Sequence, residues 1–430
     1  MRYALTNVNI ITGHNTNEIL KNKIVIVNNN KIVSIQDTLN GKIKRIDLNG
    51  RYLMPGLINL HVHLPGSGMP NHRKKQTKET VRKLMKFGLS RRVIYSMCKK
   101  FAKTELLSGV TTIRTVGGLS NFDSRIAENI ASRKIVGPRM LTSNLAISVP
   151  NGHMDGILAH TAHNPLDAIQ LVHKVASDKV NWIKLMITGG VTDAVKEGEP
   201  GVLRMAPEIV KAACNQAHIL GLKVSAHVES TEGIRVALEN GVDTIEHGAS
   251  LEQSDINLFK RHKASLVCTL SPAFPLVYLN NDLTRLTYVE KVNSKVVFDG
   301  IINCAKSCLE NDIPVGLGTD TACLFSTHYN MWRELVYFCK FVGVTPSFAI
   351  HTATLKNAQI LGVDNITGSI EVGKSADFIV LEDNPIINLN TLQNPYMVGF
   401  RGRIFRKPRA KKYKLVDEAL DRAITNVIVK

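Results

Sequence analysis

The sequence predicts an α/β protein: a (β/α)8 TIM barrel with a small β-sandwich domain built from both ends of the chain. Three observations support this fold class. The chain has 430 residues, more than one small core can organise. Between residues 55 and 362, eight short apolar runs alternate with longer segments of helical pattern. The segments on either side of this region are instead rich in strand-like runs.

The strand-like runs at the two ends indicate the small domain. Near the N-terminus they cover 3–11, 23–27 and 31–35. Near the C-terminus they cover 368–370, 376–381 and 397–405, and a helical pattern follows at 415–429. We therefore expect a small β-rich domain of residues 1–54 and 363–430, including the final helix, and a barrel domain of residues 55–362.

The central region alternates strands and helices along the chain. The predicted strands are 57–63, 110–115, 140–147, 182–187, 222–227, 244–247, 264–270 and 314–320. The predicted helical segments are 78–107, 123–133, 165–177, 207–220, 232–240, 252–262, 293–310, 332–342 and 346–361. A doubly wound sheet is the alternative, but the count of eight strands favours the barrel.

The composition is that of a globular protein with few signs of targeting. Apolar residues make up 44% of the chain, and no window has the roughly 18 consecutive apolar residues of a membrane helix. The N-terminal residues lack the apolar core and cleavage site of a signal peptide, so we expect a cytoplasmic protein. The seven cysteines are scattered and form no CxxC pair, which is typical of thiols in a reducing compartment.

The chain carries a formal net charge of +18. Its densest basic run lies at 401–414, with few aromatic residues and no recognisable nucleic-acid module. Such a run is usually a solvated face, and a contact with a polyanion is the alternative. We expect neither a nucleic-acid partner nor a membrane partner.

The segment Met-Pro-Gly-Leu-Ile-Asn-Leu-His-Val-His at 54–63 ends an apolar run in two histidines. On a strand, residues i and i+2 point to the same face, so His61 and His63 can direct two imidazoles at one point. Two converging imidazoles suit a borderline cation such as zinc. Two surface histidines without a ligand are the alternative.

Other predicted strands end in residues of the same chemistry. His227, His247 and Asp320 lie at the ends of three of them, and Lys184 lies inside an apolar run that is costly for a charge unless it is paired. Functional side chains of a barrel gather at the C-terminal ends of its strands. The set therefore predicts a metal site there.

These motifs resemble those of the amidohydrolase superfamily, the metal-dependent (β/α)8 hydrolases. The closest resemblance is to the branch of imidazolonepropionase-like proteins and Xaa-Pro and Xaa-Arg/Lys dipeptidases. The first-strand motif at 55–63, the segment Ile-Lys-Leu-Met-Ile-Thr-Gly-Gly at 183–190 and the C-terminal segment 369–381 carry the resemblance, which covers nearly the whole chain.

The resemblance implies a binuclear centre, most simply with two zinc ions. His61 and His63 would bind one metal, His227 and His247 would bind the other, and Lys184 carboxylated by carbon dioxide would bridge them. Asp320 would bind the first metal and act as a catalytic proton shuttle, and a metal-bridging hydroxide would attack the substrate carbonyl. The bridging lysine favours amide hydrolysis over deamination.

Three further residues are candidates for contacts with the substrate. His153, in a loop similar to the branch's Gly-Gly-His-Gly-Asp segment, is a candidate catalytic group that stabilises the oxyanion. Arg204 can hold a carboxylate through its guanidinium fork. Glu229 stands where several dipeptidases of the branch have a tyrosine, which is a departure from the pattern. A loop histidine and a surface arginine without contacts are the alternatives.

The leading hypothesis is a binuclear metal hydrolase that cleaves the C–N amide bond of a small molecule, such as a dipeptide or an N-acyl amino acid. A hydrolase of a cyclic amide or imidazolone-type substrate is the second hypothesis. A non-catalytic basic binding protein on the same fold is the third. The branch often forms homo-oligomers, so we expect one here.

Overall fold

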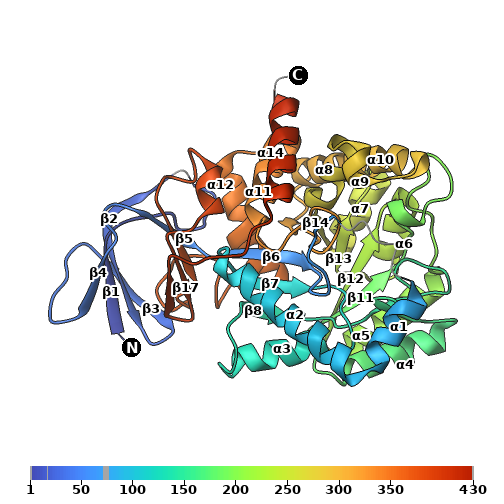
Figure 1. Ribbon diagram of the computed structural model, residues 1–430, viewed down its shortest axis with the longest axis horizontal. Helices are drawn as coiled ribbons and strands as arrows, with labels where there is room; N and C mark the ends of the chain where they lie inside the picture. Colours follow the sequence, from blue (N-terminus) through green and yellow to red (C-terminus); the bar gives the residue numbers. More distant parts are fainter. Residues whose placement is uncertain (1, 17, 71–76, 429–430) are drawn as a thin grey trace.

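The computed structural model describes residues 2–16, 18–70 and 77–428. Figure 1 shows two parts: a small sheet formed by the two ends of the chain, and a larger part in which helices lie on both sides of parallel strands. The small part has its own cluster of buried apolar side chains, while the cluster of the larger part extends onto the small sheet at Ile379 and Val398. The α/β class that the sequence predicted is confirmed.

The small part is one connected eight-stranded sheet in the order β18-β17-β16-β5-β1-β2-β3, with β4 also paired to β1. Its strands are β1 (Arg2–Ile10), β2 (Leu20–Asn28), β3 (Lys31–Gln36), β4 (Lys44–Asp47), β5 (Tyr52–Pro55), β16 (Phe378–Leu381), β17 (Met397–Phe400) and β18 (Arg403–Arg406). We expected a β-sandwich, whereas the hydrogen bonding here is continuous. The reason is that β1 pairs with β4 at one end and with β5 at the other, which joins all the strands.

The larger part contains two parallel sheets, in the orders β6-β7-β8 and β10-β9-β11-β12-β13-β14-β15. Their strands are β6 (Leu57–Val62), β7 (Val110–Thr115), β8 (Arg139–Leu141), β9 (Ala146–Ser148), β10 (Ala159–Thr161), β11 (Trp182–Met186), β12 (Lys223–Val228), β13 (Thr244–His247), β14 (Ser265–Cys268) and β15 (Val315–Leu317). Parallel strands with helical crossovers are consistent with the expected barrel. The predicted strand 140–147 was wrong in one respect: it is split into β8 and β9, with Asn144 between them in a left-handed conformation (φ 52°).

Hydrogen bonds connect the two parallel sheets at both edges. On one side, the backbone N–H groups of Asn181 and Trp182 donate to the Thr142 carbonyl oxygen, at 2.9 and 3.1 Å. On the other side, the Asn357 side-chain amide donates to the carbonyl oxygens of Ile58 and Leu317, at 2.7 and 2.9 Å. The two hydrogen bonds of Asn357 hold β6 next to β15.

Helices connect the parallel strands in the expected order. The α-helices are α1 (Lys78–Lys86), α2 (Gly88–Leu107), α3 (Phe122–Ala131), α4 (Pro165–Ala176), α5 (Pro207–Ile219), α6 (Thr231–Glu239), α7 (Gln253–His262), α8 (Leu270–Tyr278), α9 (Asn281–Thr284), α10 (Tyr288–Glu310), α11 (Met331–Tyr337), α12 (Pro346–His351), α13 (Asn357–Leu361) and α14 (Lys414–Ile428). Short 3-10 or π segments are η1 (Val191–Asp193), η2 (Phe338–Val342), η3 (Thr352–Lys356) and η4 (Leu389–Gln393).

Two helical features differ from the predictions. The single helix expected at 78–107 is broken at Phe87, whose backbone is extended (φ −87°, ψ 130°). The strand expected at 264–270 ends at Cys268, and a helix with Pro275 inside it follows. Proline is rare inside helices, so no helix was predicted there.

The C-terminal helix α14 packs against helices of the larger part, although we grouped it with the small β-rich domain. Val416, Leu420 and Ala423 belong to the larger apolar cluster. Arg333 on α11 pairs with Asp421 at 2.7 Å and with Asp417 at 3.3 Å. An apolar stripe and this ion pair therefore fix the helix where Figure 1 shows it, beside α8 and α11. Residue 429 of the predicted helix lies outside the described residues.

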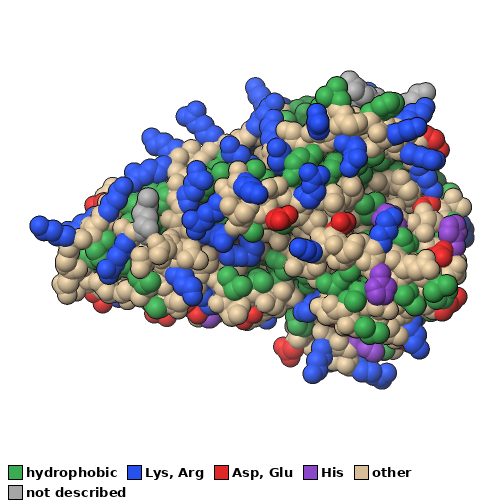
Figure 2. All heavy atoms as spheres, turned by 90° about the horizontal axis from the view of Figure 1, so that it is seen from below, with side chains coloured by type: hydrophobic (Ala, Val, Ile, Leu, Met, Phe, Trp, Pro, Cys, Tyr) green, Lys and Arg blue, Asp and Glu red, His purple; other side chains and the backbone are tan. Residues whose placement is uncertain are grey.

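The surface is rich in lysine and arginine, as Figure 2 shows for one face of the molecule. Several side chains of the basic run 401–414 have local partners. Arg401 donates to the Ala131 carbonyl oxygen, Lys412 donates to Asn394, and Arg403 lies over the ring of Phe405. Within the described ranges, no helix has both the length and the apolar character needed to cross a bilayer.

Candidate metal centre

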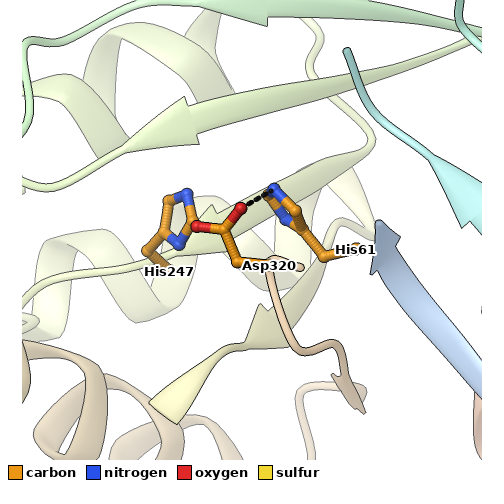
Figure 3. A group of neighbouring side chains, drawn as sticks. All are labelled: His61, His247 and Asp320. Atoms are coloured by element: carbon orange, nitrogen blue, oxygen red, sulfur yellow. Dashed lines mark ion pairs between the residues drawn. The ribbon is translucent and has the colours of Figure 1, made fainter. Parts of the chain in front are cut away.

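Four histidines from three strands converge at one end of the parallel strands. His61 lies on β6 and His63 follows it, while His227 and His247 lie on β12 and β13. The ring centroids of His61 and His247 are 4.9 Å apart, and those of His227 and His247 are 4.7 Å apart. Asp320, which follows β15, lies between the rings of His61 and His247 (Figure 3). The structure therefore brings together the residues predicted as metal ligands.

One side of this group consists of His61, His63 and Asp320, which we call the first cluster. The same carboxylate oxygen of Asp320, Oδ1, lies 3.4 Å from Nε2 of His61 and 3.1 Å from Nε2 of His63. The other ring nitrogen of each histidine forms a hydrogen bond. Nδ1 of His61 bonds to Glu246, and Nδ1 of His63 bonds to the Gly117 carbonyl oxygen, both at 2.8 Å. Both Nε2 atoms therefore face one point, as a shared ligand requires.

Close backbone packing sets the position of the first cluster. A Cβ atom on Gly318 would lie 2.5 Å from Cβ of His61, so only glycine lets the end of β15 approach β6 this closely. The backbone N–H of Asp320 then donates to the His61 carbonyl oxygen at 2.9 Å. Asp320 and His247 both have left-handed backbones (φ 48° and 69°). Such strain in residues other than glycine is typical of functional sites.

The other side consists of His227, His247 and Glu229, which we call the second cluster. Nδ1 of His247 contacts the Thr269 hydroxyl at 2.7 Å, and Nε2 of His227 contacts the Gly189 carbonyl oxygen at 3.1 Å. One ligand atom from each of His227, Glu229 and His247 lies within 4.8 Å of the others, and the same holds for His61, His247 and Asp320. The two groups share His247, so two cations could be held side by side.

Burial favours the neutral form of His61, His227 and His247, which is the form that binds metals. It lowers the pKa of His61 to about 4, against an opposing effect of Asp320. It also lowers the pKa of His227 and His247 well below the usual value, with smaller contributions from neighbouring histidines and Lys184. For Asp320 burial acts to raise the pKa, but His61 and His63 outweigh it, so the group is a carboxylate.

Lys184 lies on β11 and is 1% exposed. Its Nζ atom is buried and has no hydrogen-bond partner in the part of the chain that the structure describes. Burial lowers the pKa of Lys184 to about 8, while Glu246 opposes and Arg114 reinforces this shift. An unpartnered amine that is easily deprotonated fits the reaction with carbon dioxide that the sequence analysis anticipated.

A buried ion pair supports the first cluster. Arg114 on β7 donates from Nη2 to both oxygens of Glu246 at 2.7 and 2.8 Å, and from Nε to the Leu60 carbonyl oxygen at 2.8 Å. Burial acts to raise the pKa of Glu246, but Arg114 and then His61 outweigh it and keep the group ionised. Neither residue was predicted as part of the site. An arginine and a glutamate inside otherwise uncharged strands were the signals that could have found them.

The three predicted substrate residues occupy different positions. His153 stacks on His227 with ring centroids 4.2 Å apart, and its Nδ1 lies 2.5 Å from Asp193, which the sequence analysis did not consider. Glu229 joins the second cluster, and burial, followed by Asp320 and Asp193, raises its pKa to about 8. Arg204 is exposed, and its charge contributes to lowering the pKa of Asp193, against the effect of burial.

Comparison with known proteins identifies the family of this chain. The profile of the amidohydrolase family matches residues 52–430, and that of the NagA composite domain matches residues 2–53. A solved structure from Bifidobacterium longum, of a protein proposed to be a prolidase, is 35% identical and covers 98% of this chain and 99% of its own, with a TM-score of 0.86.

Two more distant relatives extend the comparison. A Xaa-Pro dipeptidase with bound methionine is 23% identical, covers 94% of this chain and 100% of its own, and shares the fold with a TM-score of 0.82. The ochratoxinase of Aspergillus niger is 25% identical over 393 residues, which cover 83% of this chain and 76% of that protein. The family resemblance seen in the sequence is confirmed: this chain belongs to the amidohydrolase family.

Proposed function

We propose that this chain is a hydrolase that holds two divalent metal ions, most simply zinc, and cleaves the C–N amide bond of a dipeptide or an N-acyl amino acid. The observation that carries the proposal is the buried, unpartnered Nζ atom of Lys184. Its charge acts on His61, His227 and His247, so it lies among the candidate ligands. A carbamate on Lys184, derived from carbon dioxide, would offer one oxygen to each cation and remove the cost of a buried ammonium.

The donor set suits the proposed metals. Neutral imidazoles together with carboxylates are typical ligands of zinc and similar cations. Each of His61, His63, His227 and His247 has one ring nitrogen fixed by an oxygen atom, which leaves the other available. His61, His63 and Asp320 would hold one ion, His227 and His247 the other.

We further propose that the two parallel sheets close into the predicted (β/α)8 barrel. The hydrogen bonds of Asn181 and Trp182 at one edge and of Asn357 at the other support this. In such a barrel the functional groups lie at the C-terminal ends of the strands, as the candidate ligands do here.

Bound cations would polarise the substrate carbonyl and lower the pKa of an attacking water. Asp320, kept ionised by His61 and His63, can take a proton from the attacking water and return it to the leaving amine. The contact between Nδ1 of His153 and Asp193 orients the ring, and an N–H of this ring directed at the carbonyl oxygen would stabilise the negative charge that develops there.

Arg204 supports a substrate with a free carboxylate. Its guanidinium is exposed and forms no ion pair among residues 2–16, 18–70 and 77–428. It is near the centre, because its Nε atom would lie 3.8 Å from a Cβ on Gly189, the residue whose carbonyl oxygen contacts His227. The B. longum relative, proposed to be a prolidase, also supports a dipeptide substrate.

A hydrolysis screen of the metal-loaded chain tests this proposal. Dipeptides and N-acyl amino acids would be supplied with free C-termini and as the matching C-terminal amides, with cyclic amides as a separate panel. We expect hydrolysis of the linear amides, its loss after chelation and its return with zinc. The free carboxylate should be preferred by about ten- to a hundredfold in kcat/KM, since a charged hydrogen bond contributes about 1.5–3 kcal/mol. Hydrolysis confined to cyclic amides, or none with metal bound, would contradict the proposal.

A further inference from the structure

The sequence predicted that Glu229 contacts the substrate, whereas the structure places its side chain beside His227 and His247. It lies two residues after His227, just beyond the end of β12, where alternate residues share a face. Val228 between them is buried in the apolar cluster, so His227 and Glu229 both face the opposite way. A carboxylate oxygen of Glu229 therefore lies within 4.8 Å of ring nitrogens of both His227 and His247.

One oxygen of the Glu229 carboxylate lacks a hydrogen-bond partner, although the backbone N–H of Val191 donates to this carboxylate. Its Oε2 atom is buried and accepts no hydrogen bond from any residue that the structure describes. The charged groups that act on it most are Asp320 and Asp193, which are also acidic. A cation bound between Glu229, His227 and His247 would give Oε2 the partner that it lacks.

The surrounding loop fixes Glu229 in place. The Glu229 N–H donates to the Thr188 hydroxyl at 3.1 Å. A Cβ on Gly201 would lie 2.2 Å from the Glu229 carbonyl oxygen, and a Cβ on Gly190 would lie 3.4 Å from Oε2. The two glycines thus let the loop after β11 pack directly on this residue. The side chain is held against the histidines, and its Oε2 atom is shielded from solvent although the residue is only half-buried.

We propose that Glu229 is a further protein ligand, besides His227, His247 and the bridging Lys184, of the metal ion that the two histidines hold, an inference that rests on the proposed metal centre. Two imidazoles and one carboxylate form a donor set known from zinc sites. The negative charge of Glu229 would add to the affinity of this ion. Glu229 would then contact the metal ion and not the substrate, which was its predicted partner.

Metal titration of the chain and its variants tests this inference. Chelator-treated protein would be titrated with Zn²⁺ against a chromogenic competitor, and with Co²⁺, whose visible absorption reports the ligand set. The Glu229→Gln variant keeps the side-chain size but removes the charge. Glu232→Gln is the matched control, since it removes the same charge from an exposed position three residues later.

We expect Glu229→Gln to weaken one of the two bound ions by at least about tenfold, because losing even an outer partner of a ligand costs about 10–100-fold. Its Co²⁺ spectrum should change, whereas Glu232→Gln should match the wild type. Glu229→Asp, one methylene shorter, keeps the charge but moves the oxygen, so it should also change the spectrum. Near-UV circular dichroism of the metal-free variants checks that they fold.

Wild-type metal affinities and an unchanged Co²⁺ spectrum in Glu229→Gln would overturn the inference. So would an unchanged spectrum in Glu229→Asp if the glutamine variant does not fold. A Glu229→Gln variant that binds metal normally but loses a preference for substrates with a free amine would assign Glu229 to substrate and also overturn it. A chain that shows the expected metal effects but hydrolyses no amide would contradict the proposed function and leave the ligand assignment standing.

Discussion

The two clusters of the candidate centre are built in different ways. In the first cluster, His61 is held by Glu246, which is held in turn by the buried guanidinium of Arg114. In the second cluster, His247 and His227 are held by neutral oxygens, the hydroxyl of Thr269 and the carbonyl of Gly189. The first cluster is therefore braced by buried charges, and the second by neutral hydrogen bonds and the stacked ring of His153.

This difference makes the first cluster more rigid than the second cluster. A buried, fully hydrogen-bonded ion pair holds its partners in one arrangement, and removing one member leaves an uncompensated charge. A neutral hydrogen bond contributes less and tolerates more change. The departure from the family's pattern, Glu229, lies in the second cluster. We infer that the first cluster maintains the metal site itself, while residues of the second cluster can be substituted without loss of that site.

The largest effect is expected at Lys184, which we propose bridges the ions of the two clusters. Lys184→Ala should lose most of the bound metal and nearly all activity, because neither cation would keep its bridging ligand. Added bicarbonate should not restore them, but a short carboxylate such as propionate should restore part of both. Metal content by mass spectrometry checks this, with the exposed Lys211→Ala as the control. Full metal content in Lys184→Ala would remove this residue from the centre.

Asp320→Asn probes the chemical role of the first cluster. The amide is nearly the same size, so the fold and much of the metal should remain. Turnover should fall by at least about a hundredfold, the usual contribution of a positioned proton carrier. Steady-state kinetics on the best substrate measures the effect. Turnover within a few-fold of the wild type would mean that another group carries the proton.

Arg114→Met tests the brace behind the first cluster. Glu246 would be left buried without its cation, which should lower the free energy of unfolding by about 3–5 kcal/mol. The first metal ion should also bind about 10–100-fold more weakly, because Glu246 would no longer orient His61. Denaturant unfolding of the metal-free chain and metal titration measure the two effects.

The matched control for this variant is Arg139→Met. It breaks the 2.7 Å ion pair with Asp377, and this pair includes none of the metal-binding histidines. It should lower stability but leave both metal affinities as they are. Equal losses of metal affinity in the two variants would mean that the Arg114 effect is general destabilisation.

Thr269→Val makes the corresponding change in the second cluster, and its effect should be the smallest. The substitution removes the hydroxyl at 2.7 Å from Nδ1 of His247 but keeps the shape. A neutral hydrogen bond contributes about 0.5–1.5 kcal/mol, so the second ion should bind no more than about tenfold more weakly. Zinc titration measures the change. A loss as large as that of Arg114→Met would show that the two clusters are equally braced.

Features that depend on local sequence patterns, namely most strands and helices and the residues at the strand ends, could be predicted from the sequence. Alternating strands and helices located the parallel strands other than β10, with β8 and β9 predicted as one strand. Residues in these strands and at their ends located the histidines, Lys184 and Asp320. The Arg114–Glu246 pair joins residues 132 positions apart, so only the fold reveals it. The position of α14 and the continuity of the small sheet likewise depend on long-range pairing. The helix at Leu270–Tyr278 was missed because its prolines contradict helix propensity.

The carbamate on Lys184 is the central claim, and carbon-13 nuclear magnetic resonance tests it most directly. The metal-free chain would be reloaded with zinc in the presence of ¹³C-labelled bicarbonate and then freed of excess label. We predict one protein-bound carbamate signal per chain, present with metal, absent in Lys184→Ala and lost after acid treatment. A chain that binds zinc and hydrolyses its substrate without any carbamate signal would contradict the account.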